Sequence, residues 1–514
     1  MRVQIANFKG EMPRLHPRLL PENYAQAARD IVLEDGAIRA LREPVTVHQF
    51  PGPVQRIIRH DSAWLGFDAD VDATPGPVAT SRLYITGDGA PKMRVDGQTY
   101  PLALLPPTDA PTVEILGTVD VAIAEETLFA YTYVTQWGEE SPPSPLTEPV
   151  LWHSPLQVFL QGFVTPPAGR GITLIRLYRS QTGSSGETAL HFVAEFSAFD
   201  LSHTHLPLDE PIQEPVPSTD YDAPPAGMRG IIPMPNGMMA AFDGKEVLFC
   251  EPYIPHAWPS KYVLTVAYPV VGLVALGSAL VVLTTGTPYI IQGTHPESMM
   301  QEKVESNLPC VARRGIVDMG YSALYPSPEG IVSISLSGAQ VISRELFTAD
   351  QWTALEPSTF IATSYRGRYL FSHLDGAARR IGAIDTTGTQ PFYERADISA
   401  EDLHLEIQTG AVFMLQGAEV RLWEAGAKRP YLWRSRLYHH VHREGFGAFK
   451  IDTERDGATV TRFYADGTLH HSSDAIDTPG RLPAGKATRW EVEVEGDATI
   501  SGISFAATIE ELLR

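Results

Sequence analysis

The sequence predicts an all-β protein: a β-propeller with an inserted fibronectin- or immunoglobulin-like β-sandwich module and a C-terminal β segment. Short apolar runs recur roughly every 8–12 residues with turn residues between them, a pattern typical of antiparallel all-β folds. Asp-Gly pairs such as Asp243-Gly244 separate neighbouring runs and indicate hairpins, because both turn positions must tolerate positive φ. The repeated order of strand, turn, strand, turn, strand and Pro-rich crossing within 228–343 favours the propeller.

The composition limits the classes of function. The chain has 514 residues, too many for one core, so we expect several domains. It carries 40 Lys and Arg against 61 Asp and Glu, a formal net charge of −21. This balance argues against tight binding to phosphate backbones or to an anionic membrane surface. Cys250 and Cys310 lie in or beside apolar runs, so we expect two buried thiols rather than a disulfide framework.

The sequence also gives expectations about membranes and location. No apolar run reaches the roughly 18 residues of a membrane-spanning helix, so we expect no membrane span. The first ten residues lack an apolar signal core. We therefore expect the chain to be made in the cytoplasm.

Residues 1–50 are predicted to form an extended N-terminal arm and a hairpin. Prolines within the arm exclude a helix interior and a central strand. The run 22–29 fits a short helical turn, and Asp35-Gly36 predicts a hairpin between 31–33 and 37–41. We expect an arm of this kind to contact a neighbouring domain or subunit. The equal alternative is that it packs along the surface of its own chain. The candidate intersubunit residues of the arm are Phe8, Pro13, Arg14, Leu15, Pro17, Leu19, Leu20 and Pro21.

The rest of the chain divides at changes in pattern. Residues 51–110 contain strands and tight turns that we assign to the propeller. The strongly alternating run 127–137 and a second one at 172–179 predict a β-sandwich over 112–222, and the lack of a Cys pair there favours the fibronectin type. Residues 223–430 form the predicted propeller core. Residues 431–514 are predicted to be a β-rich closing segment that ends in a short helix.

The sequence contains no pattern for a catalytic, cofactor-binding or metal site. The phosphate loop, the dinucleotide fingerprint, His-Glu-x-x-His, Cys-x-x-Cys and Gly-x-Ser-x-Gly are all absent. We therefore expect no enzyme activity and no cofactor. His203, His205 and the run His439–His442 come nearest to metal-ligand spacing, but a solvated or interface face is the favoured interpretation.

Four arginines are the best basic candidates. Arg313, Arg314, Arg366 and Arg368 lie in or beside turns, where they could face a phosphate backbone. The favoured alternative is that they pair with nearby acidic side chains of the same chain.

Several patches, taken in their shared order, resemble the tail nozzle (tail tubular protein B-like) family of short-tailed bacteriophages. The resemblance covers most of the chain in patches, and none of them is a catalytic motif. The patches are Phe8-x-Gly10-x-x-Pro13-Arg14-Leu15-x-Pro17-x-Leu19-Leu20-Pro21, Tyr131-Thr-Tyr-Val-x-x-Trp137-Gly-Glu-Glu-Ser-Pro142, Phe242-x-Gly244-x-x-Val247-x-Phe249-x-Glu251-Pro-Tyr-x-Pro-His-Ala-Trp258-Pro259, Arg481-Leu-Pro483 and Trp490-Glu-Val-Glu-Val-x-Gly496.

The resemblance implies a structural virion protein, located in the phage tail after assembly in the host cytoplasm. Members of this family form a hexameric ring below the portal and the adaptor, or head-to-tail connector, and some carry tail fibres or spikes. A propeller forms the wall of a channel through which DNA is ejected without specific binding. Six copies would carry six times −21, or −126, and a negative lumen would let DNA slide.

Two other classes of function stay open. A propeller-based carbohydrate-active enzyme would need convergent carboxylates in a central cleft. A receptor-binding adhesin would need exposed aromatic or lectin-like loops at one rim.

Overall fold

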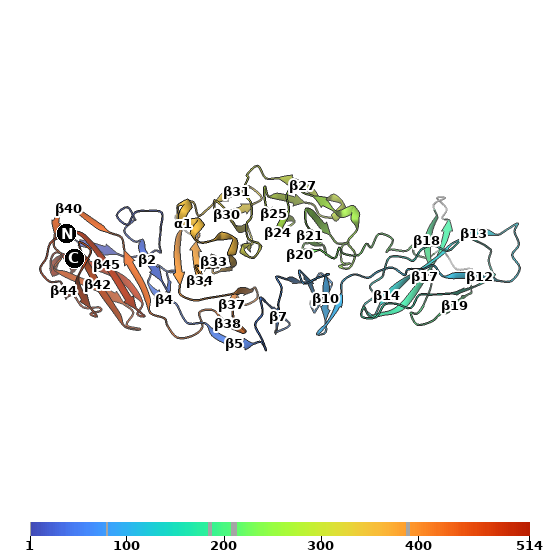
Figure 1. Ribbon diagram of the computed structural model, residues 1–514, viewed down its shortest axis with the longest axis horizontal. Helices are drawn as coiled ribbons and strands as arrows, with labels where there is room; N and C mark the ends of the chain where they lie inside the picture. Colours follow the sequence, from blue (N-terminus) through green and yellow to red (C-terminus); the bar gives the residue numbers. More distant parts are fainter. Residues whose placement is uncertain (1, 79–80, 183–187, 207–212, 387–390, 514) are drawn as a thin grey trace. The chain divides into compact units, whose positions relative to one another are not determined.

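The computed structural model describes residues 2–78, 81–182, 188–206, 213–386 and 391–513. The fold is all-β, with blades of β-propeller type, an inserted β-sandwich and a C-terminal β segment (Figure 1). The described residues include two short α-helices, α1 (Ala349–Ala354) and α2 (Ile509–Leu513). Helix α2 agrees with the short C-terminal helix that the sequence predicts.

The blades are four-stranded sheets in which consecutive strands are neighbours. This meander arises because each short apolar run ends at a turn residue and the chain then folds back beside it. The sheets of this kind are β8 (Asp72–Pro75), β9 (Leu83–Thr86), β10 (Lys92–Val95) and β11 (Gln98–Pro101); β20 (Arg229–Pro233), β21 (Met239–Asp243), β22 (Glu246–Phe249) and β23 (Leu264–Thr265); and β28 (Val317–Asp318), β29 (Ala323–Ser327), β30 (Gly330–Ser335) and β31 (Gly338–Val341). Between β23 and β28 the sequence contains the strands β24 (Val270–Leu276), β25 (Ala279–Thr284), β26 (Tyr289–Gln292) and β27 (Met300–Lys303).

The predicted hairpins within these runs are confirmed. Strands β21 and β22 pair antiparallel, with Asp243 opposite Glu246, and Gly244 in the turn has a φ of 59°. Only glycine and a few polar residues adopt this φ without strain. The hairpin 31–33 to 37–41 is present as β3 (Ile31–Val32) and β4 (Arg39–Ala40).

The chain divides into two compact units, which we describe separately. Unit 1 comprises 1–70, 279–290 and 302–514, and unit 2 comprises 71–278 and 291–301.

In unit 1 the N-terminal region completes a sheet whose other strands lie more than 350 positions later. Strand β5 (Val45–Gln49) pairs antiparallel with β38 (Glu419–Leu422), with Gln49 opposite Glu419 (Figure 1). The order of this sheet is β36 (Asp402–Glu406), β37 (Ala411–Gln416), β38 and β5. The short hairpin of β6 (Arg56–His60) and β7 (Ala63–Phe67) follows β5 in sequence.

A ten-stranded sheet in unit 1 joins a blade-like meander to the C-terminal segment. The meander consists of β32 (Ile361–Tyr365), β33 (Arg368–Asp375), β34 (Ala378–Asp385) and β35 (Phe392–Ala396). The sheet continues through β2 (Ala25–Arg29), β39 (Tyr431–Ser435), β45 (Ala487–Gly496), β42 (Thr459–Ala465) and β43 (Thr468–Ser473), with β40 (Tyr438–Glu444) paired to β45.

The helical turn predicted for 22–29 is wrong, because Ala25–Arg29 is strand β2. It pairs in parallel with β35 and antiparallel with β39, so its backbone groups are bonded to other segments. The alanine-rich run has good helix propensity, but tertiary pairing overrides so weak a preference.

The first and last strands of the described chain lie side by side. Strand β1 (Arg2–Ile5) pairs antiparallel with β46 (Ile500–Ala506). Their sheet also contains β41 (Ala448–Thr453) and β44 (Gly480–Arg481). Buried aromatic side chains such as Trp433, Phe449 and Phe505 belong to the core that this sheet shares with the ten-stranded sheet.

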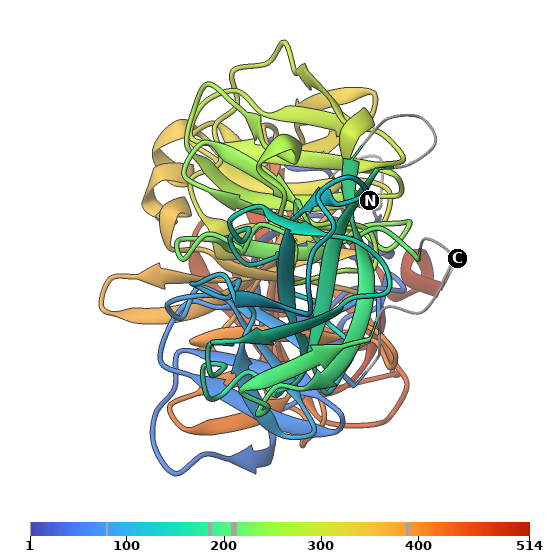
Figure 2. The same cartoon turned by 90° about the vertical axis from the view of Figure 1, so that its right-hand side faces the viewer.

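In unit 2 the predicted sandwich is confirmed. Figure 2 shows its blue-green and green strands running side by side. Alternate side chains, among them Tyr131 and Leu177 from one sheet and Leu160 from the other, form its core. One sheet is β12 (Thr112–Leu116), β16 (Gln157–Gln161) and β19 (Ser202–His205); the second is β14 (Phe129–Thr135), β17 (Ile172–Thr182) and β18 (Thr188–Ser197); β13 (Glu125–Thr127) pairs with β15 (Val150–Trp152).

Candidate functional site

The N-terminal arm lies against the rest of unit 1. Phe8 is fully buried, and its ring packs edge-on against Trp433 with the centroids 5.0 Å apart. Trp433 Nε1 donates a hydrogen bond of 3.1 Å to the carbonyl of Lys9. The backbones of Glu11 and Tyr393 exchange two hydrogen bonds of 2.7 and 2.9 Å. The backbone of the arm therefore forms hydrogen bonds with other segments of its own chain. It does not form a regular strand ladder, because the prolines further along the arm have no N–H to donate.

The candidate arm residues fall into two groups. Phe8 and Leu20 are buried, so their side chains serve the core of unit 1. Leu19 is 68% exposed and Arg14 is also exposed, although Arg14 donates to the carbonyl of Arg344. Residues with exposed side chains are the ones available to a second subunit or an adaptor. The remaining arm candidates, Pro13, Leu15, Pro17 and Pro21, are half-buried.

Glu11 ties the arm to the meander β32–β35. Its carboxylate accepts hydrogen bonds from the backbone N–H of Ala28 at 2.8 Å and from Arg395 at 2.7 and 3.0 Å. Burial raises the pKa of Glu11, and the charge of Arg395 opposes that rise. The sequence offered no signal for this carboxylate beyond its position inside the arm patch.

The basic candidates Arg313 and Arg314 pair with acidic side chains. Arg313 forms an ion pair with Asp70 at 2.7 Å. Arg314 donates to Asp402, a fully buried carboxylate that also binds Arg56 at 2.8 Å. The backbone N–H of Ile57 donates to the same carboxylate at 2.8 Å. This arrangement is the intrachain pairing that the sequence favoured.

Arg366 and Arg368 are paired in the same manner. Arg368 lies between Glu394 and Glu34, at 2.6 Å from each carboxylate. Arg366 contacts Glu34 at 3.0 Å, but its side chain is 51% exposed. Burial raises the pKa of Glu394 to about 7, although Arg368 lowers it. Of the four basic candidates, Arg366 presents the most surface to solvent.

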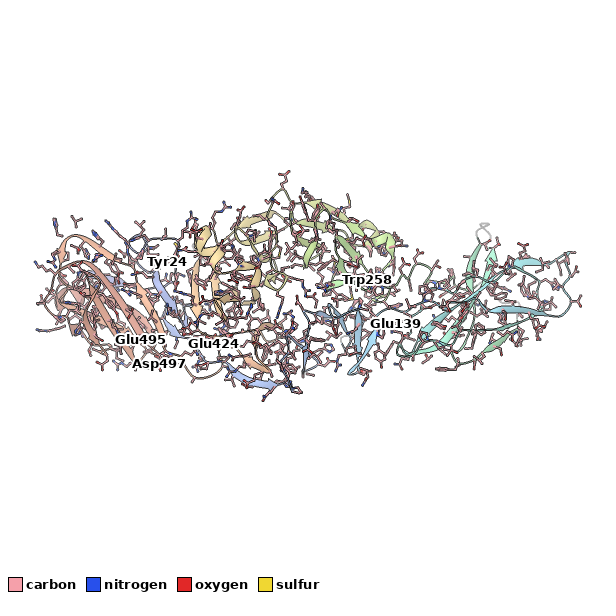
Figure 3. All side chains as sticks on the ribbon, in the orientation of Figure 1. Tyr24, Glu139, Trp258, Glu424, Glu495 and Asp497 are labelled. Atoms are coloured by element: carbon pink, nitrogen blue, oxygen red, sulfur yellow. The ribbon has the colours of Figure 1, made fainter. Side chains whose placement is uncertain are left out.

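The inserted sandwich contains a second charged network, in the loop after β14. Glu139, labelled in Figure 3, pairs with Arg82 at 2.9 Å and with Arg170 at 2.8 Å. Both guanidinium groups lie within 6 Å of the Trp137 ring centroid, at 5.8 and 5.9 Å. The Tyr100 ring meets Trp137 edge-on at 4.8 Å. The loop thus joins the sandwich to the β8–β11 blade of unit 2.

The carboxylate of the neighbouring Glu140 accepts hydrogen bonds from side chains of the sandwich, and its backbone carbonyl accepts one from the segment that follows β22. Its carboxylate accepts from Tyr178 at 2.6 Å, Thr132 at 2.8 Å and Arg176 at 2.8 Å. His256 Nε2 donates to the Glu140 carbonyl at 3.0 Å. His256 and Trp258 belong to one of the nozzle-like patches, so two such patches meet in unit 2. The sequence places both segments among the nozzle-like patches but gives no signal for the contact between them.

The remaining sequence predictions concern cysteine, metals and membranes. Cys250 and Cys310 are buried free thiols, as predicted, and burial raises the pKa of each to about 12. Within the described ranges, no three His, Cys, Asp or Glu side chains come together as a metal site. None of the helices in the described part of the chain has the length and hydrophobicity needed to cross a bilayer.

Comparisons with known proteins add a likeness of shape only. No family model and no curated protein matches the sequence. Similar solved structures include virginiamycin B lyase from Staphylococcus aureus, at 13% identity and a TM-score of 0.30, covering 74% of this chain and 97% of the lyase. The Pan2 WD40 domain of Neurospora crassa has 9% identity and a TM-score of 0.28, covering 72% of this chain and 89% of that domain. At these scores neither likeness bears on function.

Proposed function

We propose that the chain is the nozzle subunit of a short-tailed phage tail. In this proposal it is a structural, non-enzymatic virion protein that forms a ring, as a homohexamer, and continues the DNA-ejection channel below an adaptor. Fibres or spikes are further candidate partners.

The observation that carries the proposal is the structural use of the nozzle-like patches. The arm patch packs Phe8 against Trp433, and the patch around Trp137 forms the charged junction at Glu139. The residues of these patches make packing contacts and join one module to another. This structural use fits a family whose members share an architecture rather than a catalysed reaction. The formal charge of −21 supports a lumen that repels DNA rather than binding it.

The native mass of the assembly tests this proposal. We expect light scattering of the purified protein, alone and with the adaptor of the same phage, to give a particle of six times 56.3 kDa, about 338 kDa, plus any adaptor. Antibody labelling should place the chain at the tail tip of virions. A chain that stays monomeric with the adaptor and is missing from virions would contradict the proposal.

The alternative of a carbohydrate-active propeller enzyme or a receptor-binding adhesin makes a different prediction. It requires the isolated chain to cleave or bind glycans as a monomer. Hydrolysis assays on the same preparation separate the enzyme from the nozzle proposal, because a nozzle subunit releases no sugar. Glycan binding by a monomer without hydrolysis would instead favour the adhesin.

A further inference from the structure

A cleft of about 660 Å³ lies in unit 1 between the N-terminal arm and the meander β33–β35. Every residue that lines it belongs to unit 1. Leu15 and Pro17 of the arm line it with half-buried side chains, and Leu355, which follows α1, adds further apolar surface. The volume falls within the roughly 300–1,000 Å³ of small-ligand sites. The cleft is therefore large enough for a few side chains of a partner.

One guanidinium group of the cleft lining is available to an acidic partner. The lining carries three carboxylates and three guanidinium groups. Arg395 binds Glu11 at 2.7 Å, and Arg380 binds the other two carboxylates at 2.6 and 3.1 Å. The third cation, Arg29, is exposed and forms no ion pair within the described residues. An anionic group can therefore bind Arg29 without breaking an existing pair.

The arm adds further arginines that have no acidic partner. Arg14 and Arg18 are exposed, and Arg436 donates to the carbonyl of Arg18 at 2.6 Å. Arg14 likewise donates to a backbone carbonyl, and in the described part of the chain none of these three forms an ion pair. Glu22 and Glu345 are the acids next in sequence to the arm and to the Arg14 contact, and neither lines the cleft. The arm and the cleft thus form a basic surface in a chain with 21 more acidic than basic groups.

The inserted sandwich has an exposed segment with the complementary chemistry. We call residues 120–126, which lead into β13, the acidic turn. Val121 is 73% exposed and Ile123 is 61% exposed. The three acidic side chains of the turn are also exposed, and none of them forms an ion pair within the described ranges. Apolar side chains between free carboxylates match a cleft whose apolar surface lies beside unpaired arginines.

Hydrogen bonds hold the acidic turn in one conformation. The carbonyl of Asp120 accepts the backbone N–H groups of Ile123 at 3.2 Å and Ala124 at 3.0 Å. The Asp120 carboxylate accepts the N–H of Ala122 at 3.0 Å. The N–H of Asp120 donates to His153 Nε2 at 3.1 Å, which ties the turn to the segment after β15. A segment already ordered in this way loses less conformational entropy on docking.

A second exposed loop of the sandwich fits the cleft less well. Phe199 and Leu201 are 69% and 68% exposed, but only one carboxylate, Asp200, lies between them. The acidic turn offers three carboxylates to the several unpaired arginines of the arm and cleft. Charge complementarity therefore favours the acidic turn as the occupant.

We propose that the acidic turn of one copy docks in the cleft of a second copy of this chain. Val121 and Ile123 pack on the apolar surface of Leu15 and Leu355, and the carboxylates of the turn bind Arg29 and the unpaired arginines of the arm. The two patches differ, so the contact is heterologous, the type that closes into a ring when the rotation permits. The inference rests on the proposed nozzle ring only for the number of copies.

Disulfide cross-linking of the full-length protein tests the contact. Ile123→Cys and Leu15→Cys variants are mixed and oxidised; the native Cys250 and Cys310 are buried and do not compete. We expect a cross-linked dimer of twice 56.3 kDa, about 113 kDa, from the mixture and from neither variant alone. Phe199→Cys mixed with Leu15→Cys is the matched control, because Phe199 is as exposed as Ile123 on the same sandwich, and it should give no dimer.

Charge reversal tests the ionic part of the contact. We expect Glu125→Arg with Glu126→Arg to weaken self-association about tenfold or more, because like charges then face each other. Adding Arg29→Glu to the same chain should restore part of the loss. Asp200→Arg is the matched control and should leave association unchanged. Sedimentation velocity measures each step, and association of the wild type should weaken as salt is added.

Three outcomes would overturn the proposal. The first is a cross-linked mixture that gives no more dimer than the Phe199→Cys control. The second is self-association that Glu125→Arg with Glu126→Arg leaves unchanged. The third is tight binding of duplex DNA that Arg29→Glu removes, which would assign the basic surface to a phosphate backbone.

The nozzle proposal is decided separately, by light scattering and by labelling of virions. A hexamer whose subunits do not cross-link at these positions would remove this contact and leave the nozzle proposal standing. A cross-linked dimer of a chain that is missing from virions would do the reverse.

Discussion

Asp402 is a fully buried carboxylate held by arginines from two other segments of unit 1. Arg56 lies before the β6–β7 turn, and Arg314 lies in the 3-10 turn Arg313–Gly315. The carboxylate also accepts the backbone N–H of Ile57, so it joins three parts of the chain. The backbone N–H of Leu403 donates to it as well, at 2.9 Å. A buried carboxylate with these four donors is stable only while all of them stay in place.

We expect Asp402→Ala to destabilise the protein by about 2–4 kcal/mol. The substitution leaves two guanidinium groups and the buried N–H groups of Ile57 and Leu403 without this acceptor. Partial exposure of the arginines keeps the loss of stability below the value for a fully buried pair. The urea unfolding midpoint measures the change. Asp70→Ala is the control, because Asp70 is 41% exposed and should cost less than half as much.

Glu394 predicts a dependence of stability on pH. Its pKa is raised to about 7 in the folded protein, against 4.5 ordinarily, so the folded chain binds more protons between these values. The contribution of Glu394 to stability is therefore present below pH 4.5 and is lost as the pH rises toward 7, with a slope of up to about 1.4 kcal/mol per pH unit.

Thermal unfolding of the wild type and Glu394→Gln across pH 4–8 measures this effect. The difference between the two melting temperatures should change between pH 4.5 and about pH 7 and be constant above pH 7. A difference that does not vary with pH would show that Arg368 keeps the carboxylate ionised throughout.

At the scale of elements, the arm has an inner and an outer face. Phe8 packs on Trp433 in the core, whereas Leu19 lies on the surface a few residues later. The prolines between them prevent a regular strand, so each side chain is placed by its own contacts. Folding and assembly can therefore depend on different residues of the same arm.

We expect Phe8→Ala to destabilise the monomer by about 3–5 kcal/mol, because it leaves a cavity beside Trp433. Leu19→Asp should change monomer stability by no more than about 0.5 kcal/mol and should weaken ring or adaptor association. Urea unfolding and light scattering measure the two effects. An unchanged association in Leu19→Asp would remove Leu19 from the list of intersubunit candidates.

At the scale of the whole molecule, charge is the dominant feature. The excess of 21 acidic groups is spread over a chain whose four candidate arginines are paired with carboxylates. Ion pairing removes the clustered positive charge that DNA binding needs. This charge distribution favours repulsion of DNA over binding.

We therefore expect the purified protein to show no binding to duplex DNA at 0.15 M salt, with any Kd weaker than about 100 µM. Fluorescence anisotropy of a labelled 30-base-pair duplex measures this, and a basic DNA-binding domain serves as the positive control. Tight, salt-sensitive binding would contradict passage of DNA without specific contacts.

The sequence by itself determined the all-β class, the hairpin at Asp243-Gly244, the presence of an inserted β-sandwich and the two buried thiols. These features depend on alternation and turn chemistry within a few residues, which a sequence displays directly. The helical turn at 22–29 failed because propensity is weaker than strand pairing.

Only the tertiary structure decided which distant residues became neighbours. It placed β5 beside β38, Asp402 between Arg56 and Arg314, and Tyr393 with His373 in the cleft beside the arm. Each of these contacts joins segments from different strands or from opposite ends of the chain. Their pairing depends on packing and strand register rather than on local sequence, so no local pattern could have predicted them.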